Sequence, residues 1–278
     1  MKNLIVSAAV LVCASHSLAG NVWINSSKVS NYTETGSVGQ AKFRLSHTNF
    51  DMTVDRGQGT NAGQFIQANL GNNTALNNVT FNFTLQHIAG QGLIFTMVNT
   101  KNTVTNADDA TSVLSWGSFV SPPAGTTAVA IGGENAPGPS NPNAARQSFN
   151  TLRLDAQANR TQPPGSSMAF SNLVFTSGLT VADGSFYSGS VVTPSGGPAD
   201  ANEVQYLVSD MNLGAFDWTL TGSLVGYRDT LAGGDEQVRF VVGLKQSNFN
   251  IVPMPTPMAM AGAGLLAVAG LTRRRMGR

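Results

Sequence analysis

The stretch VTFNFTLQ at residues 79–86 alternates apolar and polar side chains without interruption. Successive side chains of a β-strand point to opposite faces, so this period of two predicts a strand with one buried face. The same alternation recurs at Phe216–Leu224 and, with two imperfect positions, at Val238–Leu244. Shorter strands are expected at 43–45, 93–98, 113–119, 127–131, 152–156, 168–175 and 204–208.

Turn-forming residues separate these stretches, and no part of the body repeats its apolar residues at the spacing of a helix. Many short strands separated by turns are typical of an antiparallel β-sandwich. We therefore predict an all-β, jelly-roll-like sandwich in one domain over residues 20–250, with a β-barrel as the alternative fold. A division into two domains near residues 135–148, close to a segment rich in Pro, Gly and Asn, is the alternative organisation.

Residues 1–19 have the pattern of a secretory signal peptide. A lysine at position 2 precedes the apolar run Leu4–Val12, and Ser17-Leu18-Ala19 forms a small-x-small cleavage site. We expect an N-terminal signal helix that signal peptidase removes between Ala19 and Gly20. Cys13 is the only cysteine of the chain, so the mature protein would contain no disulfide and no thiolate nucleophile.

Residues 252–278 combine a proline motif, an apolar run at 258–271 and an arginine cluster. The run has 14 residues. As a helix it would be about 21 Å long, whereas the core of a bilayer is about 30 Å thick. Arginines resist translocation, so we expect them to hold the tail on the cytoplasmic side. Because the apolar run is short, we expect only transient insertion of this helix into the inner membrane. The residues assigned to sorting or processing are Val252, Pro253, Met254 and Pro255, and those assigned to the membrane stop are Arg273, Arg274 and Arg275.

This order of features resembles the PEP-CTERM sorting signal of bacterial exosortase substrates. The resemblance implies that an exosortase-like membrane protease cuts the chain near the proline motif and passes the protein to the cell surface or extracellular matrix. Met254 stands where the family usually has glutamate, so the motif is a variant of the Val-Pro-x-Pro type. An ordinary C-terminal membrane anchor is the alternative interpretation.

Three parts of the body are similar to domains of the choice-of-anchor type. They are NVTFNFTLQHIAGQGLIFTMVN at 78–99, FNTLRLDAQ at 149–157 followed by MAFSNLVFTSG at 168–178, and FDWTLTGSLVG at 216–226. Such domains commonly precede sorting tails of this kind. The similarity implies an extracellular β-sandwich and assigns no catalytic residue.

The net charge of +1 hides an acidic body. Lys2 and four arginines within the last six residues account for five of the 16 basic residues, which leaves 11 in the body against all 15 acidic ones. The body therefore carries a net charge of −4. Such a charge does not favour nucleic acid as a partner.

The titratable side chains form no recognisable catalytic or metal-binding pattern. His47 and His87 lack the spacing of zinc ligands, and His87 is expected to lie at the surface or in a hydrogen bond. The carboxylate pairs are interpreted as exposed loop acids rather than as the facing pair of a glycosidase. A structural Ca²⁺ at Asp108 and Asp109 is the alternative. The other two pairs are Asp51 with Asp55 and Asp235 with Glu236.

Aromatic residues offer a second, weaker signal. Trp116 and Trp218 are in phase with apolar neighbours and are expected in the core, whereas Trp23 and Tyr227 remain as candidates for a sugar-stacking surface.

The sequence thus predicts an exported, non-enzymatic surface or matrix protein without a cofactor or metal. It would meet signal peptidase, the exosortase-like protease and a surface polysaccharide. A lectin-like carbohydrate-binding module and a polysaccharide-acting enzyme are the alternatives.

Overall fold

The computed structural model describes residues 20–24, 34–45, 49–55, 65–100, 110–117, 128–130, 148–158, 165–192, 201–228 and 238–247. These residues are nearly all in strands, and the helical elements among them are one turn of helix, α2 (Asn73–Leu76), and the 3₁₀ turn Leu213–Ala215. Across this part of the chain, no helix has both the length and the apolar character needed to span a membrane. The expected signal helix and C-terminal helix lie outside the described residues.

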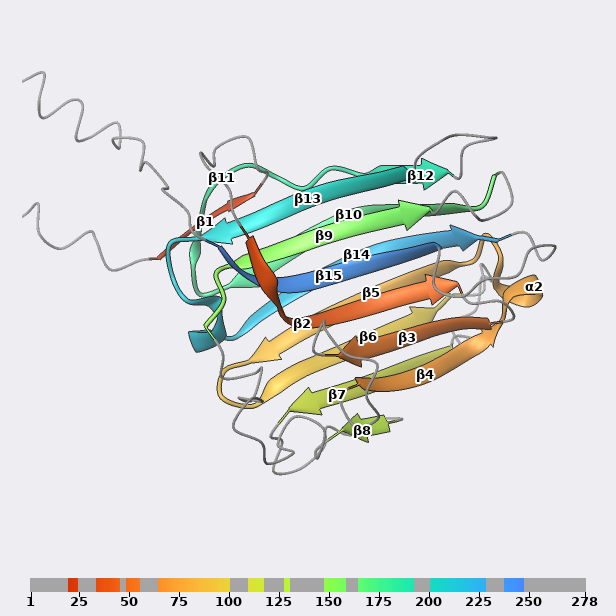
Figure 1. The fold of residues 1–278 in the computed structure, drawn as a ribbon, viewed down its shortest axis with the longest axis horizontal. Coiled ribbons are helices and arrows are strands. Elements are labelled where there is room, and N and C mark those ends of the chain that lie inside the picture. Colours follow the sequence, from red (N-terminus) through yellow and green to blue (C-terminus); the bar gives the residue numbers. More distant parts are fainter. Residues whose placement is uncertain are drawn as a thin grey trace, which may run out of the picture.

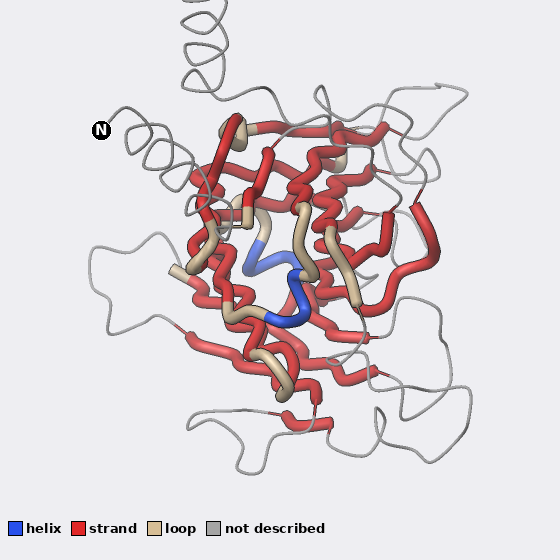
Figure 2. Tube along the Cα trace, turned by 90° about the vertical axis from the view of Figure 1, so that its left-hand side faces the viewer, coloured by secondary structure: helices blue, strands red, loops and turns tan. Residues whose placement is uncertain are grey.

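The strands form two sheets, whose layers are superposed in Figure 1 and seen from the side in Figure 2. All neighbouring strands are antiparallel except the pairs β1–β11 and β7–β8. The eight-stranded sheet has the order β11 (Thr180–Asp183), β1 (Asn21–Ile24), β13 (Ala201–Ser209), β9 (Thr151–Ala158), β15 (Val238–Ser247), β2 (Glu34–Leu45), β3 (Asn49–Asp55), β4 (Phe65–Asn72). The seven-stranded sheet has the order β12 (Gly189–Val192), β10 (Ser167–Ser177), β14 (Trp218–Tyr227), β5 (Thr80–Ile88), β6 (Gly92–Asn99), β7 (Ala110–Gly117), β8 (Ala128–Ala130).

Aromatic side chains join the two sheets face to face. Phe43 of β2 lies with its ring centroid 5.0 Å from that of Phe81 of β5. Phe240 of β15 lies 5.7 Å from Phe83 of β5 and 5.5 Å from Phe170 of β10. All five rings are buried in one hydrophobic cluster that draws on both sheets. The strands of both layers run in similar directions across Figure 1, as expected for two aligned sheets.

Both halves of the sequence contribute to each sheet. In the eight-stranded sheet, β15 pairs with β2 on one side and with β9 on the other. In the seven-stranded sheet, β14 lies between β10 and β5. Strands that precede residues 135–148 are therefore hydrogen-bonded to strands that follow them, and they share one core.

The alternating stretches predicted as strands are confirmed. Residues 79–86 fall largely in β5, 218–224 in β14 and 238–244 in β15, and the expected apolar positions of these strands are buried. Phe216 lies just before β14, because the 3₁₀ turn Leu213–Ala215 ends there. The described residues of the shorter predicted segments also lie in strands, although Ser118, Phe119, Thr127 and Ile131 are outside the described part.

The sequence interpretation missed five strands, of which β3 is the most instructive. Phe50, Met52 and Val54 are buried in the core and alternate with Asp51 and Thr53. This is a period of two, yet the aspartates had suggested a loop. The other missed strands are β1, β4, β11 and β12.

Candidate binding groove on the eight-stranded sheet

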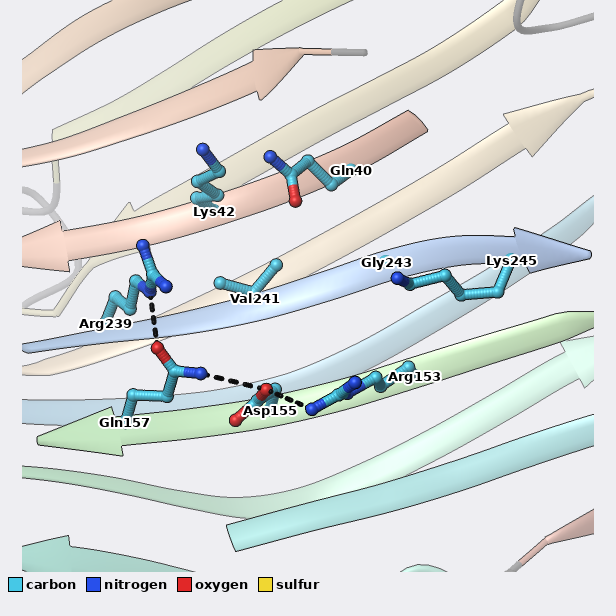
Figure 3. A pocket seen from close by; sticks show the side chains of 9 residues that line it. All are labelled: Gln40, Lys42, Arg153, Asp155, Gln157, Arg239, Val241, Gly243 and Lys245. Atoms are coloured by element: carbon cyan, nitrogen blue, oxygen red, sulfur yellow. Dashed lines mark hydrogen bonds and ion pairs between the residues drawn. The ribbon is translucent and has the colours of Figure 1, made fainter. Parts of the chain in front are cut away.

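A polar groove lies across the three middle strands β2, β15 and β9 of the eight-stranded sheet. It faces away from the sandwich core, because the alternate residues on these strands, such as Phe43, Phe240 and Leu154, point into the core. The groove has a volume of about 380 Å³. Its lining residues, which Figure 3 shows, are Gln40, Lys42, Arg153, Asp155, Gln157, Arg239, Val241, Gly243 and Lys245.

The groove arises from a difference in side-chain size between neighbouring strands. The middle strand β15 contributes the small residues Val241 and Gly243. These residues pair with Lys42 and Gln40 on β2 and with Asp155 and Arg153 on β9. The middle strand therefore forms a low floor, and the longer side chains of the two flanking strands rise on either side of it (Figure 3).

The register distributes positive charge along this floor. Successive outward positions of β15 are Arg239, Val241, Gly243 and Lys245. Val241 pairs with Lys42, and Gly243 pairs with Arg153. Each step of two residues, about 7 Å along a strand, therefore brings one cation. With Asp155 as the one acidic lining residue, the lining holds four cations and one carboxylate, a formal charge of +3.

Asp155 is the centre of a polar chain that runs along the β9 side of the groove and reaches β15. Its Oδ2 accepts a hydrogen bond from Arg153 Nη2 at 2.9 Å and one from Gln157 Nε2 at 3.0 Å. Gln157 Oε1 in turn accepts a bond from Arg239 Nε at 2.8 Å. These contacts, drawn as dashed lines in Figure 3, fix the orientations of two cations on adjacent strands.

Burial raises the pKa of the Asp155 carboxyl above 3.8, against the opposing effects of Arg153, Gln157 and Arg239. Asp155 is only 6% exposed, so water stabilises its charged form poorly. A carboxyl with a raised folded-state pKa stabilises the fold when protonated. That stabilisation is complete below the ordinary pKa and is lost as the pH rises through the folded-state pKa.

Asp155→Asn should therefore change how stability depends on pH. As the pH rises from below 3.8 through the folded-state pKa, the wild-type protein should lose stability relative to the variant. The difference should grow by at most about 1.4 kcal/mol per pH unit and then level off. Urea unfolding of both proteins at several pH values measures this difference in the free energy of unfolding. Subtracting one free energy from the other cancels the contribution of every other carboxyl that titrates alike in both proteins. Parallel curves through this window would contradict the assignment.

The sorting and processing residues lie outside the described part of the chain, apart from Gly20. Those outside are Ala19, Val252, Pro253, Met254, Pro255, Arg273, Arg274 and Arg275. Gly20 is buried, and its carbonyl oxygen accepts a hydrogen bond from Thr180 N at 3.1 Å. The next residue, Asn21, donates its backbone N–H to Asp210 Oδ1 at 2.8 Å.

His87 is a core residue, so the expected surface position is wrong and the hydrogen-bonded alternative is right. Its side chain is fully buried, and its Nδ1 lies 2.8 Å from the carbonyl oxygen of Phe216. The imidazole stacks on Trp218, with ring centroids 5.4 Å apart. Trp218 is itself 2% exposed, which confirms its prediction as a core residue. His47 lies outside the described residues.

Asp51 corrects the interpretation of the carboxylates as exposed loop acids. It belongs to β3, is 2% exposed and forms a buried ion pair with Arg44 of β2. Asp55 ends the same strand. In the part of the chain with described coordinates, no three His, Cys, Asp or Glu residues come together in a way that could hold a metal ion. The remaining carboxylates of the three pairs, Asp108, Asp109, Asp235 and Glu236, are outside that part.

Trp23 and Tyr227 do not come together. Val22 and Ile24 point into the core from β1, so Trp23 faces outward from the eight-stranded sheet. On β14 the buried positions include Leu224 and Gly226, so Tyr227 faces outward from the seven-stranded sheet. The two rings lie on opposite sides of the sandwich and form no common sugar-stacking surface. Trp116 belongs to β7.

Sequence reasoning did not find the groove residues. The signal that could have indicated the groove was a set of charged residues at outward positions of predicted strands. Examples are Arg153 and Asp155 on β9 and Arg239 and Lys245 on β15. Only the pairing of β2, β15 and β9 places these charges side by side. Searches against models of known protein families and against curated proteins found no match for the chain.

Proposed function

We propose that this chain is an exported, non-enzymatic protein of the bacterial cell surface or extracellular matrix. The observation that carries the proposal is the tripartite tail at 252–278, with its proline motif, short apolar run and arginine cluster. In this proposal signal peptidase cuts after Ala19, and an exosortase-like membrane protease cuts near 252–257. The sandwich then serves in structure, adhesion or contact with a surface polysaccharide.

The contacts of the fold support a mature chain that starts at Gly20. The carbonyl of Gly20 and the N–H of Asn21 already take part in hydrogen bonds to Thr180 and Asp210. A cut between Ala19 and Gly20 would leave both bonds in place. Ser209 Oγ adds a third bond, to the carbonyl oxygen of Asn21 at 3.1 Å.

The contacts at the end of β15 support processing at the C-terminal end of the domain. Ser247 ends this strand and is held by Asn150, whose Oδ1 accepts from Ser247 N at 3.0 Å and from Ser247 Oγ at 2.9 Å. Thr151 Oγ1 lies 2.6 Å from the same hydroxyl. A cut at 252–257 would remove none of these residues.

Strand connections support the jelly-roll-like form of the proposal. From β9 to β15, each strand lies in the other sheet from the strand before it. Alternation of this kind is common in jelly rolls and Greek-key sandwiches.

The absence of a catalytic role is proposed because the groove has one carboxylate, Asp155, held in an ion pair with Arg153. A glycosidase would need a second carboxylate facing it.

The proposal predicts that the surface-located protein lacks its C-terminus. Mass analysis of protein from the native cell surface should find no peptide from 265–274. A variant with Pro253→Ala and Pro255→Ala should retain that peptide, because the extended segment presented to the protease is lost. Thr256→Ser in the same segment is the control and should be processed normally. Recovery of the peptide from the wild-type surface protein would overturn the processing step.

A further inference from the structure

Four of the six basic residues that the structure describes line the groove, although the body as a whole is acidic. The lining carries a formal charge of +3, whereas residues 20–251 carry −4. The concentration marks the groove as the place where an anion would meet the protein.

The shape of the groove favours a chain-like anion over a small one. Its cations follow the strand direction from Arg239 to Lys245, and Lys42 and Arg153 lie between them in register. Six residues of strand separate the two ends, which corresponds to about 20 Å. A single phosphate or carboxylate would contact one step of this row, whereas a linear polyanion would contact every step.

The uncharged lining residues favour a sugar chain. Gln40 and Gln157 carry amide groups that can donate to and accept from hydroxyls. Val241 and Gly243 give a low, apolar floor on which the C–H face of a sugar ring can rest. No aromatic side chain is among the lining residues, so the groove lacks the stacking surface that single-stranded nucleic acid requires.

From this charge, shape and lining we propose that the groove of β2, β15 and β9 binds an acidic polysaccharide. Its carboxylate or sulfate groups would pair with Lys42, Arg153, Arg239 and Lys245, and its hydroxyls with Gln40 and Gln157. Arg153 and Arg239 are held in place by the Asp155–Gln157 chain before the ligand arrives. Such preorganisation reduces the entropy lost on binding. The inference supplies the ligand class that the proposed surface function leaves open and rests on that function for the extracellular source of the polymer.

Binding of the purified full-length chain to immobilised polysaccharides tests the proposal. Chondroitin sulfate and polygalacturonate serve as sulfated and carboxylated probes, dextran as the neutral probe and poly(dT) as the nucleic acid probe. Both acidic polysaccharides should bind at low salt and be released as salt rises, because screening weakens the charge contacts. Dextran should not bind, and poly(dT) should bind more weakly than either acidic sugar.

Variants separate the groove from net charge. Lys42→Gln and Lys245→Gln should each weaken binding about three- to tenfold, and the double variant more than either. Lys42→Gln combined with Thr221→Lys keeps the net charge, because one lysine is lost and one is gained. Thr221 lies on the outward face of the seven-stranded sheet, so the new lysine is far from the groove. This variant should bind as weakly as Lys42→Gln alone.

Three results would overturn the inference. They are failure of both acidic polysaccharides to bind at low salt, full recovery of binding in the Lys42→Gln, Thr221→Lys variant, and equal or tighter binding of poly(dT). Thermal unfolding of each variant shows that a loss of binding is not a loss of fold. These measurements use purified protein, so they can fail while the surface protein is still processed. Processing can equally fail while the groove still binds.

Discussion

Phe240→Ala should lower the free energy of unfolding by about 3–5 kcal/mol, among the largest effects expected for a single substitution in this protein. Phe240 lies on the middle strand β15 and is 2% exposed. Its ring contacts Phe83 and Phe170 of the opposite sheet, with centroids 5.7 Å and 5.5 Å away. Alanine would leave a cavity between the sheets, where neither backbone can move far enough to fill it.

Urea unfolding monitored by tryptophan fluorescence measures this effect, since Trp218 is buried in the same cluster. Phe240→Leu keeps most of the volume and should cost under about 1.5 kcal/mol. Val174→Ala is the surface control: Val174 lies on β10 and is 54% exposed, so the change should be within about 0.5 kcal/mol. Equal losses for Phe240→Ala and Val174→Ala would contradict the assignment of Phe240 to the contact between the sheets.

Asp51→Asn should destabilise the protein by about 3 kcal/mol through the loss of a buried ion pair. Asp51 and Arg44 are directly opposed on β3 and β2, and both are at most 9% exposed. Arg44 Nε donates to Asp51 Oδ1, and Arg44 Nη2 donates to Asp51 Oδ2 at 3.2 Å. On its other side Arg44 is opposed to Arg239 of β15. Removing the carboxylate would leave two cations on neighbouring strands, one of them buried, without this compensation.

A double variant distinguishes the cost of leaving Arg44 without its partner from the net contribution of the ion pair to stability. Arg44→Met with Asp51→Leu replaces both charges by apolar groups of similar size and should recover most of the stability. Asp217→Asn is the matched control. Asp217 is exposed, and its Oδ1 accepts from Ala89 N at 2.8 Å, a bond that asparagine can retain. A loss of under about 1 kcal/mol for Asp51→Asn, equal to that of Asp217→Asn, would show that the pair is not buried in solution.

The strands were predictable where burial is one-sided and uninterrupted. Residues 79–86, 218–224 and 238–244 carry apolar side chains at every second position, and each stretch is a strand with that face in the core. β3 was not predicted as a strand, because Asp51 and Asp55 suggested a loop. An aspartate is tolerated in a strand when a partner neutralises it, and Arg44 on the adjacent strand does so for Asp51. That partner becomes apparent only when β2 and β3 are paired.

The groove was not predictable from the chain alone. Arg153 and Asp155 are two residues apart, which indicates a shared face of one strand. Arg239 and Lys42 come from distant parts of the sequence, and no local pattern relates them to Arg153. The order β9–β15–β2 decides that their side chains line one surface. The same order decides that the small residues Val241 and Gly243 lie between longer ones.

The all-β fold class and the set of side chains that each alternating strand buries follow from the amino-acid sequence. The reason is that both depend on a period of two, a local property of an extended chain. Which strands are neighbours follows from the packing of the folded chain. This packing brought four cations together on an acidic body, placed Trp23 and Tyr227 on opposite faces, and buried His87 and Asp51 beside their partners. These features depend on hydrogen bonds between strands that are far apart in the sequence, and the register of those bonds is set by packing of the whole core.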